Sequence, residues 1–265
     1  MKKIVSVLIL SFSMLVFLSS VQAMTVGTDS PKIRVTVKPG ETSSGVIKVN
    51  NGGNKPVKVN VYISDWLYQP QGDGNKNFLP AATTPLSCAK WLNIHPMEFE
   101  LYPDEIRSIN YTITVPADAI GGHYAVVFFE TDMGVQEVKG MNVKVKGRVG
   151  SLVYVESDGQ VTRQGEVTDL KVSVPNKGEP LKIEVAFANK GNVDVTAKGT
   201  FHIIDQAGNI FVRDKLEEIY TLPGDKVKSV TSWSGSLQKG EYDLILTYDL
   251  GNNQSIIQET KLNIP

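Results

Sequence analysis

Short segments of alternating apolar and polar residues recur along the chain and limit its possible folds more than any other feature. In KIRVTVK, Ile33, Val35 and Val37 occupy every second position, and PVKVNVYIS continues the same pattern from Val57 to Ile63. Residues two apart lie on one face of an extended strand, so each segment predicts a half-buried β-strand. Turn sequences such as KPGE, NNGGN, NKGN, QAGN and LPGD separate the segments. No long segment has an apolar period of 3.6 residues, and we therefore expect an all-β fold.

The chain also repeats its own pattern, which predicts two tandem domains. Three blocks recur in the same order: VNNGGNKPVKVNVYISD with FANKGNVDVTAKGTFHIID, LYPDEIRSI with TLPGDKVKSV, and GHYAVVFFET with GEYDLILTYD. About 100 residues with roughly seven short strands is the size of an immunoglobulin-like β-sandwich. We expect one such domain over residues 24–157 and a second over 158–265, with the polar stretch ESDGQVTRQGE at the boundary.

The first of the two Gly-x-Tyr strands has apolar side chains on both faces, and both faces must be covered. GGHYAVVFFET, which begins at Gly121, is apolar on both faces, so we expect a central strand with one face in the sandwich. The other face needs a cover, for which the candidates are domain two and the inserted segment at residues 69–85. The strand-entry residues Gly122 and Tyr124, like Gly240 and Tyr242, are interpreted as structural, with each tyrosine closing a corner by a backbone hydrogen bond.

The N-terminus has the three parts of an export signal. Lys2 and Lys3 precede an apolar run from Ile4 to Leu18, and small residues lead to a cleavage site after Ala23. The run is too short to span a bilayer well, and no later stretch reaches about 20 apolar residues. We therefore expect a cleaved signal peptide at residues 1–23. The mature chain should then have no integral membrane segment and act in the periplasm or at the cell surface.

Composition argues against several functions. The formal net charge of −1 leaves no basic surface for nucleic acid. The single cysteine, Cys88, permits no internal disulfide and is interpreted as a buried thiol. His95, His123 and His202 have no metal-ligand spacing, and no nucleophile motif is present. We expect no catalytic residues, no metal, no cofactor and no enzymatic activity. QGDGNKN, from Gln71, is interpreted as a solvated hairpin tip.

Two groups of side chains are candidate partner contacts. Trp66 and Tyr68 place two aromatic rings at a strand end, where they either cap the core or anchor a protein or sugar partner. Positive charge gathers on the non-core face of a later strand, which either discourages aggregation or binds an anionic envelope polymer. These residues are Lys139, Lys144, Lys146 and Arg148.

The chain resembles the exported bacterial WxL-interacting-type proteins. The resemblance rests on SCAKWLNIHPMEFELYPDEIRSINYTITVPADAIGGHYAVVFFET, including the strand from Trp91 to Pro96, and on FANKGNVDVTAKGTFHIIDQAGN. It covers nearly all of the mature chain. It implies two immunoglobulin-like domains, with Trp91 as a structural residue, in a protein of the cell envelope.

A more distant similarity is to the periplasmic pilus-assembly (PapD-like) chaperones. These proteins complete a subunit with a strand of alternating apolar residues and hold its terminal carboxylate with an Arg and a Lys. Arg34 lies roughly where the similarity places that Arg, and Val143, Val145 and Val149 give the alternating strand. Gly150 stands where the Lys is expected, so the resemblance implies the fold more than the capture mechanism.

Together these observations predict a non-enzymatic, exported binding or assembly module of the bacterial envelope. It would contact an envelope protein or a cell-wall polymer through sheet edges and the interdomain groove. The alternative is a periplasmic pilus-type chaperone that donates a strand to a secreted subunit.

Overall fold

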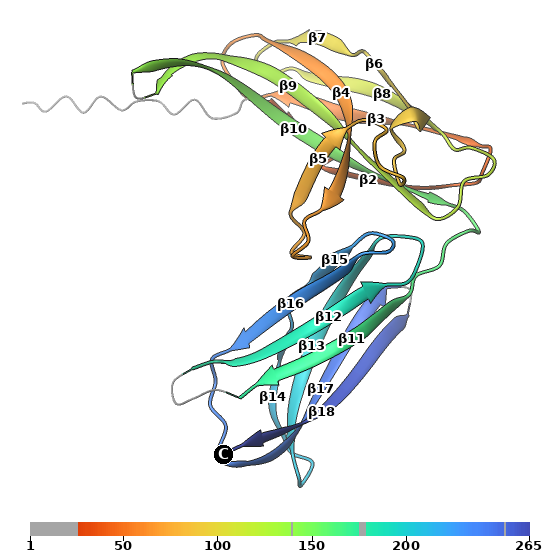
Figure 1. Cartoon of the computed structure of the whole chain (residues 1–265). Coiled ribbons are helices and arrows are strands. Elements are labelled where there is room, and N and C mark those ends of the chain that lie inside the picture. The colour runs from red at the N-terminus through yellow and green to blue at the C-terminus, as the bar shows by residue number, and fades with distance from the viewer. Residues whose placement is uncertain (1–25, 139, 175–178, 252) are drawn as a thin grey trace, which may run out of the picture.

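The computed structural model describes residues 26–138, 140–174, 179–251 and 253–265. The predicted signal peptide and Lys139 lie outside this part of the chain. The described residues form strands and one short 3-10 helix, arranged as two β-sandwiches in tandem (Figure 1). The all-β, two-domain immunoglobulin-like prediction is therefore confirmed. Among the described residues, no helix is long and apolar enough to cross a membrane.

The first sandwich ends at Ser157 and consists of two sheets. Its elements are β1 (Val26–Thr28), β2 (Lys32–Val37), β3 (Thr42–Asn51), β4 (Val57–Tyr68), β5 (Lys76–Pro80), η1 (Ala89–Trp91), β6 (Leu92–His95), β7 (Glu98–Leu101), β8 (Ile106–Thr114), β9 (Gly122–Val138) and β10 (Met141–Ser157). One sheet has the order β1-β3-β8-β6, and the other has the order β2-β10-β9-β4-β5, with β7 also paired to β4. The chain enters in the first sheet and crosses to the second between β1 and β2.

The second sandwich begins at Gly165 and is smaller. Its strands are β11 (Gly165–Ser173), β12 (Leu181–Asn189), β13 (Val195–Asp205), β14 (Ile210–Lys215), β15 (Ile219–Thr221), β16 (Lys226–Trp233), β17 (Gly240–Gly251) and β18 (Gln254–Ile264). The sheet β11-β12-β16 packs on the sheet β14-β13-β17-β18, whose strand β13 also pairs with β15. Apolar residues at alternate positions of facing strands fill the space between the sheets, as the sequence period requires.

The repeated sequence blocks build equivalent turns in the two sandwiches. Asn51 ends β3 and donates its side-chain amide to the carbonyl of Lys55, while its side-chain oxygen accepts from Gly53. Asn189 ends β12 and makes the corresponding bonds to Val193 and Gly191. An Asn at the strand end thus closes the same local turn twice, because its side chain satisfies backbone groups that the ladder no longer pairs.

β9 is the strand that is apolar on both faces, and each of its faces packs against other side chains. It lies between β10 and β4, and Ala125, Val127 and Phe129 face the core of the first sandwich. Val126 and Phe128 point to the opposite side, into a second cluster that includes Leu222 of the second sandwich. Phe78 of the inserted segment packs edge-on against Phe128, with ring centres 4.9 Å apart, so the inserted segment and the second sandwich both contribute to the cover of this face.

Candidate functional site

The edge of β10 is open over much of its length. β10 pairs with β9 along nearly all of its residues, but it pairs with β2 only from Leu152 to Ser157. The amide of Leu152 donates to the carbonyl of Pro31, whereas the amide of Ser157 donates to Gly121 on the β9 side. Backbone groups of successive residues point to opposite sides of a strand. The even-numbered residues of β10 from 142 to 150 therefore direct their N–H and C=O groups to a side where no described strand pairs with them.

The same segment has an apolar inner face. β9 and β10 run on beyond the sandwich as a two-stranded ribbon, residues 131–138 and 140–147, which we call the arm (Figure 1). Met141 and Val143 are 65% and 41% exposed, and Val145 is half-buried. These three side chains share the face that Val149 directs toward the core of the first sandwich. The alternating apolar strand implied by the resemblance is thus present and uncovered at its outer end.

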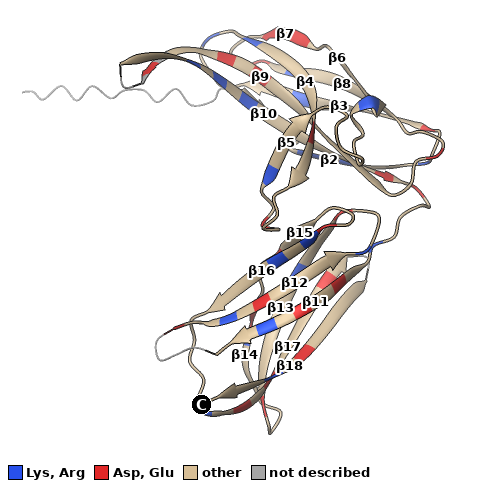
Figure 2. Cartoon of the chain, in the orientation of Figure 1, with Lys and Arg blue, Asp and Glu red and all other residues tan. Residues whose placement is uncertain are grey.

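Ion pairing reduces the positive charge predicted on the outer face of the arm. Lys146 is paired with Glu130 at 2.7 Å. The Arg148 guanidinium lies 4.4 Å from the centre of the Phe128 ring and 5.4 Å from that of Phe78. Among the described lysines and arginine of this cluster, Lys144 and Arg148 are exposed without a recorded ion pair, and Arg148 also donates a hydrogen bond to the Tyr62 hydroxyl. Figure 2 shows acidic residues interspersed with the basic residues along these strands, an arrangement unlike that of a polyanion-binding surface.

An aromatic cluster, which we call the aromatic wall, is packed between the sandwiches. Trp66 is 1% exposed and donates its indole N–H to the carbonyl of Ala125. Its ring packs edge-on against Tyr68, Tyr124 and Tyr154, with centroid separations between 5.0 and 5.6 Å. Trp66 was predicted as a possible partner contact, but this position encloses its ring, so it belongs to the packing between the sandwiches. Tyr68 is half-buried, and burial raises the pKa of its hydroxyl.

Two lysines lie over this aromatic wall. The Lys32 ammonium is 4.3 Å from the centre of the Tyr154 ring, and the Lys76 ammonium is 5.1 Å from that of Tyr68. Burial and the neighbouring positive charges lower the pKa of both lysines: Arg34 acts on Lys32, and Lys32 acts on Lys76. Neither ammonium has an ion pair recorded among the described residues. No local sequence pattern predicts this pair, because the two residues are 44 positions apart and reach the same aromatic wall only through the fold.

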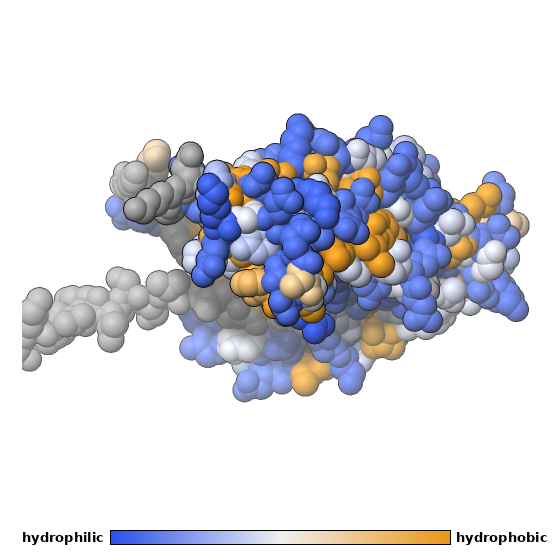
Figure 3. All heavy atoms as spheres, turned by 90° about the horizontal axis from the view of Figure 1, so that it is seen from below, coloured by the Kyte–Doolittle hydropathy of each residue, from blue (hydrophilic) through white to orange (hydrophobic). Residues whose placement is uncertain are grey.

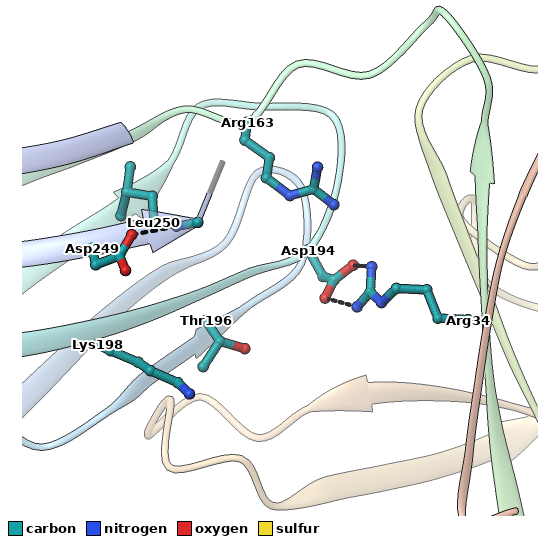
Figure 4. A pocket seen from close by; sticks show the side chains of 8 residues that line it. Arg34, Arg163, Asp194, Thr196, Lys198, Asp249 and Leu250 are labelled. Atoms are coloured by element: carbon teal, nitrogen blue, oxygen red, sulfur yellow. Dashed lines mark hydrogen bonds and ion pairs between the residues drawn. The ribbon is translucent and has the colours of Figure 1, made fainter. Parts of the chain in front are cut away.

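Arg34, by contrast, is engaged within the protein. Its guanidinium donates to both carboxylate oxygens of Asp194, at 3.0 and 2.6 Å (Figure 4), and it also donates to Glu156. Arg163 pairs with the same Glu156 at 2.5 Å. Burial lowers the pKa of Arg34, but the interactions with Asp194 and Glu156 outweigh it and raise the pKa overall. Arg34 was predicted to meet a partner, but its donors here join the two sandwiches.

The predicted structural residues have distinct roles. The Tyr124 hydroxyl accepts a hydrogen bond from the backbone amide of Asp194 at 2.6 Å. Because Asp194 belongs to the second sandwich, this bond joins the two sandwiches. The Tyr242 hydroxyl donates to the carbonyl of Gln238 at 3.0 Å within its own sandwich. The amide of Gly122 donates to Asn192 at 2.7 Å, and a Cβ on Gly122 would lie 2.3 Å from the Tyr124 hydroxyl. Two other residues were predicted to be structural. Gly240 begins β17, and a Cβ on it would lie 3.7 Å from the Tyr242 ring. The ring centre of Trp91 lies 4.2 Å from that of His123.

A hollow of about 310 Å³ lies beside this ion-pair network. It is lined by residues of both sandwiches and the linker: Arg34, Arg163, Asp194, Thr196, Lys198, Asp249, Leu250 and Gly251 (Figure 4). Its charges are of both signs: Arg34 pairs with Asp194 across the hollow, and Arg163 pairs with the neighbouring Glu156. Among the described residues, no group of three or more His, Cys, Asp or Glu side chains is placed to hold a metal ion. Cys88 is fully buried, and burial raises the pKa of its thiol.

Exposed apolar residues elsewhere are scattered. Viewed from below, the surface shows hydrophobic patches separated by hydrophilic side chains (Figure 3). Ile210 and Phe211 on β14 are 61% and 56% exposed, and Ile257 on β18 is 66% exposed. These residues lie on opposite edges of one sheet, so they do not form a single patch.

Comparison with known proteins returned structural similarity alone. No family model matches the chain, and no curated protein matches it. A solved chaperone–tip adhesin complex of CFA/I fimbriae biogenesis contains a chain that is 14% identical, with a TM-score of 0.48, over 89% of this chain and 98% of that one. The class 5 fimbriae chaperone CfaA is 13% identical, with a TM-score of 0.46, over 91% of this chain and 99% of its own. A chaperone–tip subunit pre-assembly complex of archaic Csu pili from Acinetobacter baumannii gives 10% identity and a TM-score of 0.44, over 89% and 98%.

Proposed function

We propose that this chain is a non-enzymatic, exported assembly protein that binds an extended segment of a partner polypeptide along the open edge of β10. The observation that carries the proposal is the unpaired edge of residues 142–150, beside the uncovered apolar face of the arm. An added strand would satisfy the free N–H and C=O groups, and Met141, Val143 and Val145 would pack against the partner. This is the chaperone alternative of the sequence analysis, and the predicted signal peptide agrees with it.

The position of the lysine pair supports a partner strand that ends in the groove. Pro31 occupies the edge of β10 at Leu152, so a strand added over residues 142–150 cannot continue past that point. Lys32 follows directly, and Lys76 lies over the same aromatic wall. A terminal carboxylate at this end would pair with two ammonium groups that have no ion pair among the described residues. In this proposal Lys32 and Lys76 perform the anchoring that the resemblance implied for Arg34 and position 150.

Proline substitution tests the edge. Lys146 directs its amide to the open side, so Lys146→Pro removes a donor for an added strand while leaving the ladder to β9 intact. Lys146→Ala is the matched control, because both changes remove the pair with Glu130. Each variant, tagged at its C-terminus, is expressed in the cells that export it, crosslinked, and purified with its partners. We expect one protein to co-purify stoichiometrically with the wild type and Lys146→Ala, and at least tenfold less of it with Lys146→Pro.

Other outcomes lead to different conclusions. Equal recovery with Lys146→Pro and Lys146→Ala would mean that the partner does not use the β10 edge. Recovery of wall polymer or of many surface proteins would instead favour an envelope adaptor of the WxL-interacting type. Loss of the partner from Lys32→Ala and Lys76→Ala, with the edge intact, would separate the anchoring role from strand addition.

A further inference from the structure

The inserted hairpin between β4 and β5 extends to the second sandwich. Its tip, residues 69–75, which we call the brace loop, meets the region of β15 and β16 (Figure 1). The amide of Tyr220 donates to the carbonyl of Gly72 at 2.9 Å. The sequence pattern predicted a solvated tip, and Asp73 and Asn75 are indeed exposed, but Gly72 is buried. The tip is therefore partly a buried contact, because the second sandwich supplies a surface that the local sequence does not reveal.

Two glycines allow this close approach. A Cβ on Gly72 would lie 2.9 Å from a methyl carbon of Val227, and one on Gly74 would lie 3.1 Å from the Tyr220 ring. Both glycines have positive φ angles, 67° and 84°, which residues with a side chain rarely adopt. The Tyr220 ring also packs on Tyr68 at the base of the hairpin, with ring centres 5.8 Å apart. The brace loop thus contacts the second sandwich through backbone, and a side chain at position 72 has no room.

Separate contacts hold the other side of the groove. Asp194 receives the Arg34 guanidinium, and its amide donates to Tyr124. The amide of Gly122 donates to the carbonyl of Asn192. These bonds lie near the linker, whereas the brace loop contacts β15 and β16. A hinge at the linker would be free to swing if it were held on one side only, and contacts on both sides oppose that motion.

From this geometry we infer that the brace loop is an interdomain strut that holds the two sandwiches at one angle, with Gly72 as the residue that sets the contact. The groove between the sandwiches is then formed before any partner arrives. The inference concerns the free protein and does not depend on what the open edge of β10 binds.

A distance measurement between the sandwiches tests the inference. Lys48→Cys and Lys239→Cys place exposed thiols on the first and second sandwich, and the fully buried Cys88 should remain unlabelled. Spin labels at the two sites report the distribution of interdomain distances. We expect a single narrow distribution for the parent protein. Gly72→Leu should broaden it or add a second, separate distance, because the side chain cannot fit against Val227.

The matched control is Gly208→Leu. Gly208 also has a positive φ angle, 84°, but a Cβ there meets nothing within 4 Å, so it introduces backbone strain without an interdomain clash. Its distance distribution should equal that of the parent.

Tyr220→Ala is a second variant that removes the ring under the brace loop and should act like Gly72→Leu. A broad distribution in the parent, or unchanged distances in both Gly72→Leu and Tyr220→Ala, would overturn the inference.

Discussion

At the scale of single residues, buried carboxylates and hydroxyls organise segments that lack regular structure. Asp65 is fully buried and accepts four hydrogen bonds, from the amides of Ala82, Thr83 and Thr84 and from the hydroxyl of Ser87. In the loop that follows β5, this single carboxylate therefore accepts the backbone hydrogen bonds that a neighbouring strand would accept in a sheet. Such a group is costly to alter, because its donors would remain buried without an acceptor.

We expect Asp65→Asn to lower the free energy of unfolding by about 1–3 kcal/mol, because its amide cannot accept all four bonds. Burial raises the pKa of Asp65, but the four hydrogen bonds outweigh it and lower the pKa overall. The stabilisation is thus complete above the ordinary pKa of about 3.9 and is lost as the pH falls through the lower, folded-state value. Urea unfolding from pH 7 to pH 2.5 should show an acid-dependent loss in the wild type that is smaller in Asp65→Asn.

Tyr124→Phe should destabilise the protein by about 1–2 kcal/mol, since it leaves the buried amide of Asp194 without its acceptor. Tyr242→Phe, which removes a bond to Gln238, is the comparison within one sandwich. Thermal melts measure both effects. An unchanged melting temperature for Tyr124→Phe would contradict the structural role assigned to this hydroxyl.

At the scale of elements, β10 combines two different environments in one strand. From Leu152 onward it is a central strand between β2 and β9, and its residues are mostly buried. Before that point it is an edge strand with exposed apolar side chains. Long apolar edges are usually blocked by charge or by a covering segment. The charged side chains among the described residues of the arm lie on its outer face.

Substitutions on the two faces of the arm should therefore differ in effect. Val143→Asp places a charge on the apolar inner face, and we expect partner recovery in the crosslinking experiment to fall at least tenfold. Asn142→Asp adds the same charge on the outer face and should leave recovery unchanged. Both positions are exposed, so both variants should melt close to the wild type. Equal loss of the partner from both variants would indicate that charge, and not the inner face, governs binding.

At the scale of the whole molecule, the groove joins the sandwiches through apolar packing as well as ion pairs. Leu222 is the member of the second sandwich that completes the aromatic cluster around Trp66, and it is 1% exposed. Burial of this side chain couples the folding of the two sandwiches, since its apolar contacts lie on the first sandwich.

Leu222→Ala should cost about 2–4 kcal/mol through lost burial and the cavity that remains. Calorimetry should then resolve two unfolding transitions, and the emission of Trp66 should shift to longer wavelength as water reaches the groove. Val230→Ala, at an exposed apolar residue of the same sandwich, is the control and should have little effect. A single unshifted transition in Leu222→Ala would mean that the sandwiches are coupled by the polar contacts alone.

The alternating period of Ile33, Val35 and Val37 was enough to predict strands, and the three repeated blocks were enough to predict two sandwiches. These features are local or periodic, and each strand must direct one face to a core whatever its neighbours are. The apolar faces of GGHYAVVFFET likewise required that β9 be central, although the sequence left open which segments cover its second face.

Pairing across the fold was decided by tertiary structure. Arg34 and Asp194 are 160 positions apart, and Lys32 and Lys76 lie over rings of the same aromatic wall although β2 and β5 are opposite edges of one sheet. Trp66 looked available because its strand ends in a polar loop, yet three tyrosines of the first sandwich and Leu222 of the second enclose it. Periodicity specifies which face of a strand is apolar, whereas the side chain that meets that face depends on the order of strands and the angle between sandwiches. Those properties arise from packing over the whole chain, and no short stretch of sequence contains them.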